Sequence, residues 1–160
     1  MTQPMVTLAG YQAFLTNYVQ IPVYALPLSS PQILMTLAMA EATVNPVIQI
    51  ANGSPNSCLG YTGDGLYEIA VYNLATDFLI NFAQDQPGQD FFSKLRTSFT
   101  INDFVPGLIS ASNDETTGET LLTQDYMKTL TLSDIQRMKT PYGRRYLEIA
   151  QSFGTLWGLS

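Results

Sequence analysis

Residues 65–84 read GLYEIAVYNLATDFLINFAQ. In a helix, the polar positions Asn73, Asp77 and Gln84 form a narrow strip, and most of the remaining circumference is apolar. A helix that is apolar on nearly all sides lies in the centre of a bundle. The stretch therefore predicts a central helix, which the turn-forming sequence DQPG ends at residues 85–88.

Helical signals flank this segment on both sides. In residues 7–19 the side chains of Leu8, Tyr11, Leu15 and Tyr18 share one stripe. Two Ser/Thr–Pro pairs, at Ser30 and Thr140, each supply a capping hydroxyl followed by proline at the first helical position. A short helix starts at Thr131 or Ser133. We therefore expect further helices over residues 7–19, 31–45, 89–98, 133–139 and 141–153.

Three segments between these helices are irregular. Residues 20–28 contain two prolines and predict an extended connector, and residues 52–65 predict an ordered loop in which Asp64 caps the next helix. Residues 100–123 are polar and predict either a short hairpin, with strands near 105–111 and 119–123, or a mobile loop. The expected fold class is mainly α, a compact bundle of about four to five helices with a polar protruding loop or β-hairpin at about 100–123. One helical domain spans residues 1–154, and a C-terminal docking tail follows at 155–160.

The composition favours an oligomer. Of the 160 residues, 46% are hydrophobic and only 12% are charged, whereas soluble domains average roughly 25% charged residues. Charged residues are depleted from the cores of protein interfaces. We therefore expect part of the surface to be covered by copies of the chain or by a partner. The alternative is a monomer whose surface is rich in Ser, Thr, Asn and Gln.

The charges are unevenly placed along the chain. Residues 1–93 contain six acidic residues and no Lys or Arg, and all seven basic residues lie between Lys94 and Arg145. Phosphate binding depends on basic side chains, so this acidic chain is poorly suited to gripping nucleic acid. An acidic wall could still line a channel through which DNA slides without sticking.

Few residues here have the chemistry of a catalytic or metal site. The chain has no histidine and one cysteine, Cys58, which excludes histidine-based triads and thiolate zinc sites within one chain. The paired carboxylates Asp64/Glu68 and Asp114/Glu115 are better explained by helix capping and a solvated loop than by acid–base catalysis. The loop NDETTGET, residues 113–120, has its acidic residues out of register for a calcium loop. We expect no enzymatic activity, no cofactor and no metal ion.

Localisation signals are equally sparse. The N-terminus lacks the basic region of a signal peptide, and no apolar run is long enough to cross a bilayer. A single cysteine fits synthesis in a reducing cytoplasm. The last residues carry the only tryptophan, Trp157, in a tail that is suited to inserting into a neighbouring subunit.

The segment TPYGRRYLEIAQSFG, residues 140–154, resembles the closing helix of tailed-bacteriophage head–tail connector (adaptor) proteins. The matching residues are Thr140, Tyr142, Gly143, Tyr146 and Leu147. The preceding GLISASNDETTGETL is similar to that family's Ser-rich stretch, and the apolar helix at 65–84 to its central helix. The first 60 residues lack this resemblance.

The resemblance implies a structural protein of the virion neck. Its subunits form a ring, commonly a dodecamer, which binds the portal, extends the DNA channel and provides a platform for a downstream neck or tail protein. Genomic DNA would pass through without specific binding, and no membrane is involved. The implied portal or partner interface comprises Thr140, Pro141, Tyr142, Arg144, Arg145, Tyr146, Phe153, Leu156 and Trp157. The implied channel-facing or tail-facing loop carries Asp114, Glu115 and Glu119.

Three other functions remain open from the sequence. A tail-completion or tail-terminator protein of the virion would have a sheet-rich fold. A small cellular helical binding module would stay a monomer or dimer and never form rings. An enzyme that uses carboxylates alone is the third alternative.

Overall fold

The computed structural model describes residues 6–45, 65–102, 111–113, 118–120 and 131–152. The described residues are mainly helical, which confirms the mainly α part of the predicted fold class. Each of the six predicted helical segments contains a helix. The helical elements are α1 (Leu8–Phe14), the π-helical turn η1 (Leu15–Val19), α2 (Pro31–Thr43), α4 (Leu66–Phe82), α5 (Phe91–Ser98), α6 (Leu132–Arg137) and α7 (Pro141–Ser152).

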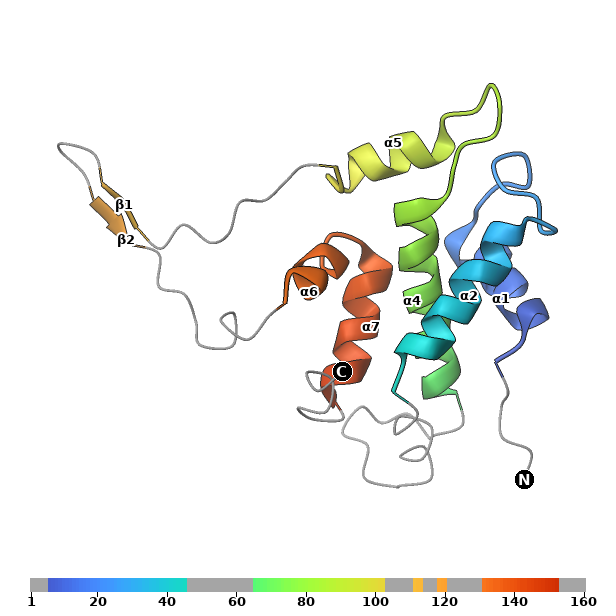
Figure 1. The fold of residues 1–160 in the computed structure, drawn as a ribbon, viewed down its shortest axis with the longest axis horizontal. Coiled ribbons are helices and arrows are strands. Elements are labelled where there is room, and N and C mark those ends of the chain that lie inside the picture. Colours follow the sequence, from blue (N-terminus) through green and yellow to red (C-terminus); the bar gives the residue numbers. More distant parts are fainter. Residues whose placement is uncertain (1–5, 46–64, 103–110, 114–117, 121–130, 153–160) are drawn as a thin grey trace.

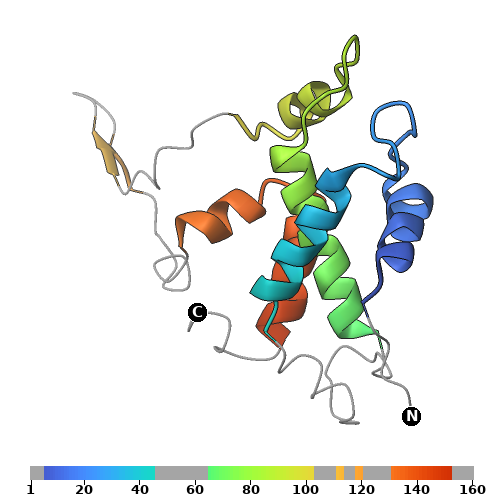
Figure 2. The same cartoon turned by 45° about the vertical axis from the view of Figure 1, so that its right-hand side comes forward.

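Helix α4 is the centre of the bundle, as its sequence predicts. It packs against α2 on one side and α7 on another, and α5 lies across its C-terminal end (Figures 1 and 2). Its buried residues lie all around the helix and include Ala70, Val71, Leu74 and Leu79. Of the predicted polar strip, Asn73 and Asp77 are buried, whereas Gln84 is exposed beyond the end of α4.

Helix starts follow the local capping chemistry. The Ser30 hydroxyl accepts a hydrogen bond from the Gln32 amide at the start of α2. At the start of α6, Thr131 and Asp134 form a reciprocal capping box, which resolves the choice between Thr131 and Ser133. Such caps satisfy amides that have no partner within the helix.

One local prediction is wrong, and one apolar stripe is only partly buried. Residues 20–28 form turns instead of an extended connector, with the Ala25 amide bonded to the Pro22 carbonyl. The apolar stripe of residues 7–19 is only half buried, since Tyr18 is 77% exposed. The turn at Leu15–Val19 is π-helical and therefore wider, so it rotates Tyr18 away from the face that carries Tyr11.

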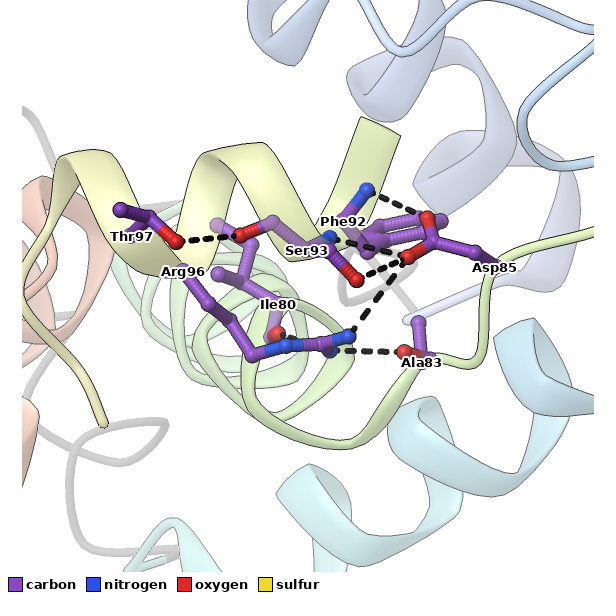
Figure 3. Close-up of polar contacts among 7 residues, drawn as sticks. All are labelled: Ile80, Ala83, Asp85, Phe92, Ser93, Arg96 and Thr97. Atoms are coloured by element: carbon purple, nitrogen blue, oxygen red, sulfur yellow. Dashed lines mark hydrogen bonds and ion pairs between the residues drawn. The ribbon is translucent and has the colours of Figure 1, made fainter. Parts of the chain in front are cut away.

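A polar corner fixes α5 to the end of α4 (Figure 3). The Asp85 carboxylate accepts hydrogen bonds from the Phe92 and Ser93 amides, which caps α5 from outside the helix. The Arg96 guanidinium donates to the carbonyls of Ile80 and Ala83 at the C-terminus of α4. Desolvation of Asp85 acts to raise its pKa, but the hydrogen bonds from Ser93 and Phe92 and the charge of Arg96 outweigh it and lower the pKa. The polar groups of Asp85 and Arg96 thus have hydrogen-bond partners within the subunit.

Within residues 100–123, the structure describes two three-residue strands, β1 (Ala111–Asn113) and β2 (Gly118–Thr120). They pair antiparallel, with Ala111 opposite Thr120. The pair is shorter than the strands that the sequence predicted. The predicted 52–65 loop, apart from Gly65, lies outside the described residues, as does Asp64.

Candidate interaction surfaces

The segment that carries the family resemblance begins with a buried polar contact. The Thr140 hydroxyl donates to the Asp77 carboxylate over 2.5 Å and accepts a bond of 2.9 Å from the Gly143 amide. Thr140 therefore caps α7 and ties it to α4 at the same time. Its side chain is fully buried, which corrects the prediction that Thr140 belongs to a partner interface.

Gly143 allows α7 to approach the end of α6 closely. A Cβ atom at this position would lie 2.1 Å from the carbonyl oxygen of Arg137, and 2.8 Å from its carbonyl carbon. Both distances are far below van der Waals contact. The Thr-x-Tyr-Gly pattern at residues 140–143 thus has an architectural role in this chain.

Tyr146 is also internal to the subunit. It is only 7% exposed, and the Arg137 guanidinium lies 5.4 Å from its ring centre. Arg137 in turn pairs with Asp134 of the α6 cap at 3.5 Å. Helix α6 therefore covers most of Tyr146 within the subunit.

The exposed part of the predicted interface is the outer side of α7. Pro141 and Arg144 are exposed, and Tyr142 and Arg145 are partly exposed. Arg145 forms an ion pair with Glu148 at 2.6 Å. Phe153, Leu156, Trp157, Asp114 and Glu115 lie outside the described residues, and for Glu119 only the backbone in β2 is described.

Asp77 is the one strongly perturbed carboxyl group among the described residues. Burial raises its pKa to about 6, against the weaker opposing effects of the Thr140 hydrogen bond and the Arg137 charge. A perturbed carboxyl in a cleft is a candidate acid or base. The Asp77 side chain is instead only 2% exposed, where α4 packs against the start of α7. Its surroundings are therefore those of a structural contact.

Helix α2 presents an uncovered apolar face that the sequence analysis missed. Leu34, Met35 and Met39 are 57%, 51% and 39% exposed, while Ile33 and Leu37 of the same helix are buried. Glu41 is the only charged residue among the thirteen of α2. We call Leu34, Met35, Ala38, Met39 and Ala42 the α2 face. The signal for it was present as a helix with apolar residues on all sides and one charge.

A second uncovered feature is a groove of about 350 Å³ between α1–η1 and the first half of α4. Its walls include Phe14, Tyr18, Ile69 and Tyr72. The Phe14 ring stacks on Tyr18 at a centroid distance of 5.4 Å and contacts Tyr72 at 5.7 Å. We call this feature the α1–α4 groove.

Other kinds of site were sought in the same part of the chain. No cluster of three or more Cys, Asp or Glu residues suited to a metal ion occurs among the described residues. None of the helices that the structure describes is long and apolar enough to cross a bilayer. Comparison of the chain with family models, curated proteins and solved structures finds no match.

Proposed function

We propose that the chain is a structural virion protein without enzymatic activity, a subunit of a ring-shaped head–tail connector in the neck of a tailed bacteriophage. The ring would bind the portal, extend the DNA channel and offer a platform to a downstream neck or tail protein. The proposal joins the resemblance at residues 140–154 to the physical character of the surface.

The observation that carries the proposal is the α2 face. Three large apolar side chains on consecutive turns are about half exposed, on a helix with a single charge. Monomeric proteins rarely leave contiguous apolar patches of this kind uncovered. A copy of the same chain is the simplest cover, and head-to-tail contacts between copies close into a ring when the rotation permits.

The charge distribution supports a channel through which DNA passes unbound. The net charge is −6, and no Lys or Arg occurs before Lys94. A ring multiplies this charge by its subunit number, so its field repels the phosphate backbone. The polar segment that contains Asp114, Glu115 and Glu119 is proposed to face the channel or the tail.

The portal contact is proposed to involve the outer side of α7. Pro141, Tyr142 and Arg144 are at least partly exposed there after Thr140 and Tyr146 are assigned to the interior, and Arg145 lies beside them in its ion pair with Glu148. Arg144 forms no ion pair within the described part of the chain and can meet an acidic residue of the portal. The positive end of this surface contrasts with the acidic remainder of the subunit.

The direct test is reconstitution with the portal protein encoded by the same genome. Purified chain is mixed with portal rings and inspected by negative-stain electron microscopy and sedimentation velocity. A ring of added density on one end of the portal, with one chain per portal subunit or a fixed ratio, supports the connector. An Arg144→Glu/Arg145→Glu variant is expected to weaken the complex at least tenfold, with an unchanged circular dichroism spectrum.

A matched control is Lys94→Glu, a charge reversal at an exposed residue of α5, far from α7 along the chain. It should bind the portal as the parent does. A protein that stays a monomer or dimer with portal present, and adds no density to it, would contradict the connector and favour a cellular helical binding module.

A further inference from the structure

The α1–α4 groove lacks an occupant within the described residues, and it has the properties of an aromatic side-chain receptor. Its aromatic walls are held by ring contacts, because Tyr72 stacks on Tyr11 at a centroid distance of 5.6 Å and meets Phe14 in a tilted contact at 5.7 Å. Tyr18 stands 77% exposed on the rim, carried by the π-helical turn. Single π-helical turns frequently occur at functional sites.

The base of the groove is fixed by hydrogen bonds. The Tyr72 hydroxyl donates to one carboxylate oxygen of Glu68 over 2.7 Å and accepts from the Thr7 amide over 3.3 Å. Gly10 lets α1 come this close, since a Cβ there would lie 2.3 Å from the Tyr72 hydroxyl oxygen. The other oxygen of Glu68 has no hydrogen-bond partner among the described residues. An aromatic occupant with an N–H group would therefore find both stacking surfaces and an acceptor.

The chain itself contains such an occupant. The eight residues that follow α7 read FGTLWGLS and include Leu156 and Trp157, with no charged side chain. An indole ring is a large apolar surface that needs one acceptor for its N–H. The groove volume of about 350 Å³ lies in the range of sites that hold a small organic group.

The arrangement of the helices favours a tail from another copy. Helix α7 starts beside Asp77 and runs antiparallel to α4, so its last residue, Ser152, lies at the end of the bundle where α4 begins (Figures 1 and 2). The groove includes Glu68 and Tyr72 of that same half of α4. Asp77 and Tyr72 are five residues apart, which is about 140° around an α-helix. The tail therefore leaves one side of the subunit, and the groove opens on a different side at the same level.

We propose that Leu156 and Trp157 of one subunit dock in the α1–α4 groove of its neighbour, with the Trp157 indole stacked on Tyr18 and Phe14. A tail and a groove on different sides of each subunit form a head-to-tail contact, which closes into a ring when the rotation between neighbours permits. This inference rests on the proposed connector function and assigns the tail to the contact between copies. The portal contact then falls to the outer side of α7.

Cysteine cross-linking tests the contact and its direction. In a Cys58→Ser background, one protein carries Asn17→Cys at the groove rim and a second carries Leu156→Cys in the tail. After mixing and mild oxidation, we expect a disulfide-linked species of two chains, formed at least tenfold more than with a Thr43→Cys protein, whose exposed residue ends α2. No cross-link above that control overturns the proposal. A cross-link that forms only within one chain of the Asn17→Cys/Leu156→Cys protein also overturns it.

Binding measurements on the full chain give a second readout. Trp157→Ala and Tyr18→Ala are each expected to weaken self-association at least tenfold, as for aromatic anchors at interfaces, and Tyr18→Ala should leave folding intact because the residue is exposed. Trp157 emission should shift to shorter wavelength on assembly in the parent and not in Tyr18→Ala. Rings on the portal that form without the cross-link would refute the groove contact alone, whereas absence of rings in the parent would refute the connector function.

Discussion

The Thr140 hydroxyl donates a hydrogen bond of 2.5 Å to the carboxylate of Asp77, 63 residues earlier in the chain. This contact joins the start of α7 to the middle of the central helix. It also gives a physical reason for the threonine and glycine of the segment that resembles connector proteins: the first caps and anchors α7, and the second lets α6 approach it. The threonine and the glycine of this pattern are therefore explained by contacts within the subunit, without a contact to a partner.

The Asp77 carboxyl group should make the protein less stable as the pH rises from 4 to 7. Its pKa is about 6 in the folded state and near its ordinary value of 3.8 when unfolded, so the folded protein binds more protons between these values. Two units of pKa correspond to about 3 kcal/mol of unfolding free energy. Urea unfolding followed by circular dichroism across this pH range measures the loss.

Asp77→Asn should remove most of this pH dependence, because the amide oxygen still accepts from Thr140 and does not titrate. At pH 7 the variant should be as stable as the parent or more so. Asp90→Asn, which makes the same change at a carboxylate that is 67% exposed in its ion pair with Lys94, is the matched control. An unchanged slope in Asp77→Asn would show that another group titrates.

Gly143→Ala should destabilise the fold by about 1–3 kcal/mol, the usual cost of forcing extra volume into a packed site. The added Cβ would lie 2.1 Å from a backbone oxygen, which cannot rotate away. Helix propensity alone would make the alanine variant about 1 kcal/mol more stable than the parent. A loss of stability therefore indicates the clash, and a gain indicates propensity. Urea unfolding of this variant and of Gln151→Ala, an exposed change in the same helix, separates clash from propensity. Stabilisation by Gly143→Ala would contradict the close approach of α6.

The elements themselves could be predicted because their signals are local. Ser30, Thr131 and Thr140 start helices through hydrogen bonds to amides two or three residues away, and sequence order alone reveals such pairs. Asp77 was visible as one of two acids in an apolar helix, but its partner was not, since nothing local to residue 77 specifies residue 140. The same limit applies to Tyr146, whose cover comes from Arg137 of α6.

The surfaces could not be located from the sequence for a different reason. In α2 the buried residues Ile33 and Leu37 and the exposed residues Leu34 and Met35 have the same chemical character, so periodicity does not tell inside from outside. The composition indicated that some apolar side chains stay on the surface of the subunit. The packing of the helices determines which ones they are. Tyr18 shares the stripe of Tyr11 in a regular α-helix, and the π-helical turn moves it outward.

Arg96→Met should release α5 from the end of α4. The guanidinium, whose side chain is 17% exposed, donates to two α4 carbonyls that have no other partner within the helix, and it lies 3.9 Å from the Asp85 carboxylate. A hydrogen bond to a charged group contributes about 1.5–3 kcal/mol, so the loss of two is expected to cost about 3 kcal/mol or more. Hydrogen–deuterium exchange should accelerate across α5 while most of α4 stays protected. Lys94→Met, which removes an exposed ion pair on the same helix, should change stability by less than about 1 kcal/mol.

Charges placed on the α2 face should block ring assembly without unfolding the subunit. Leu34→Glu and Met35→Lys change side chains that are already 57% and 51% exposed, so the melting temperature should move little in either variant. Burying an unpaired charge between copies is costly, and self-association should fall by at least tenfold, measured by sedimentation velocity with and without portal. Thr43→Lys adds the same positive charge as Met35→Lys, but at an exposed position of α2 outside the α2 face, and should assemble normally. The Leu34→Glu and Met35→Lys proteins carry opposite charges on one face, so an equal loss of self-association in both would indicate that apolar burial drives the contact. Rings that form unimpaired from both variants would show that the α2 face is not part of the subunit contact.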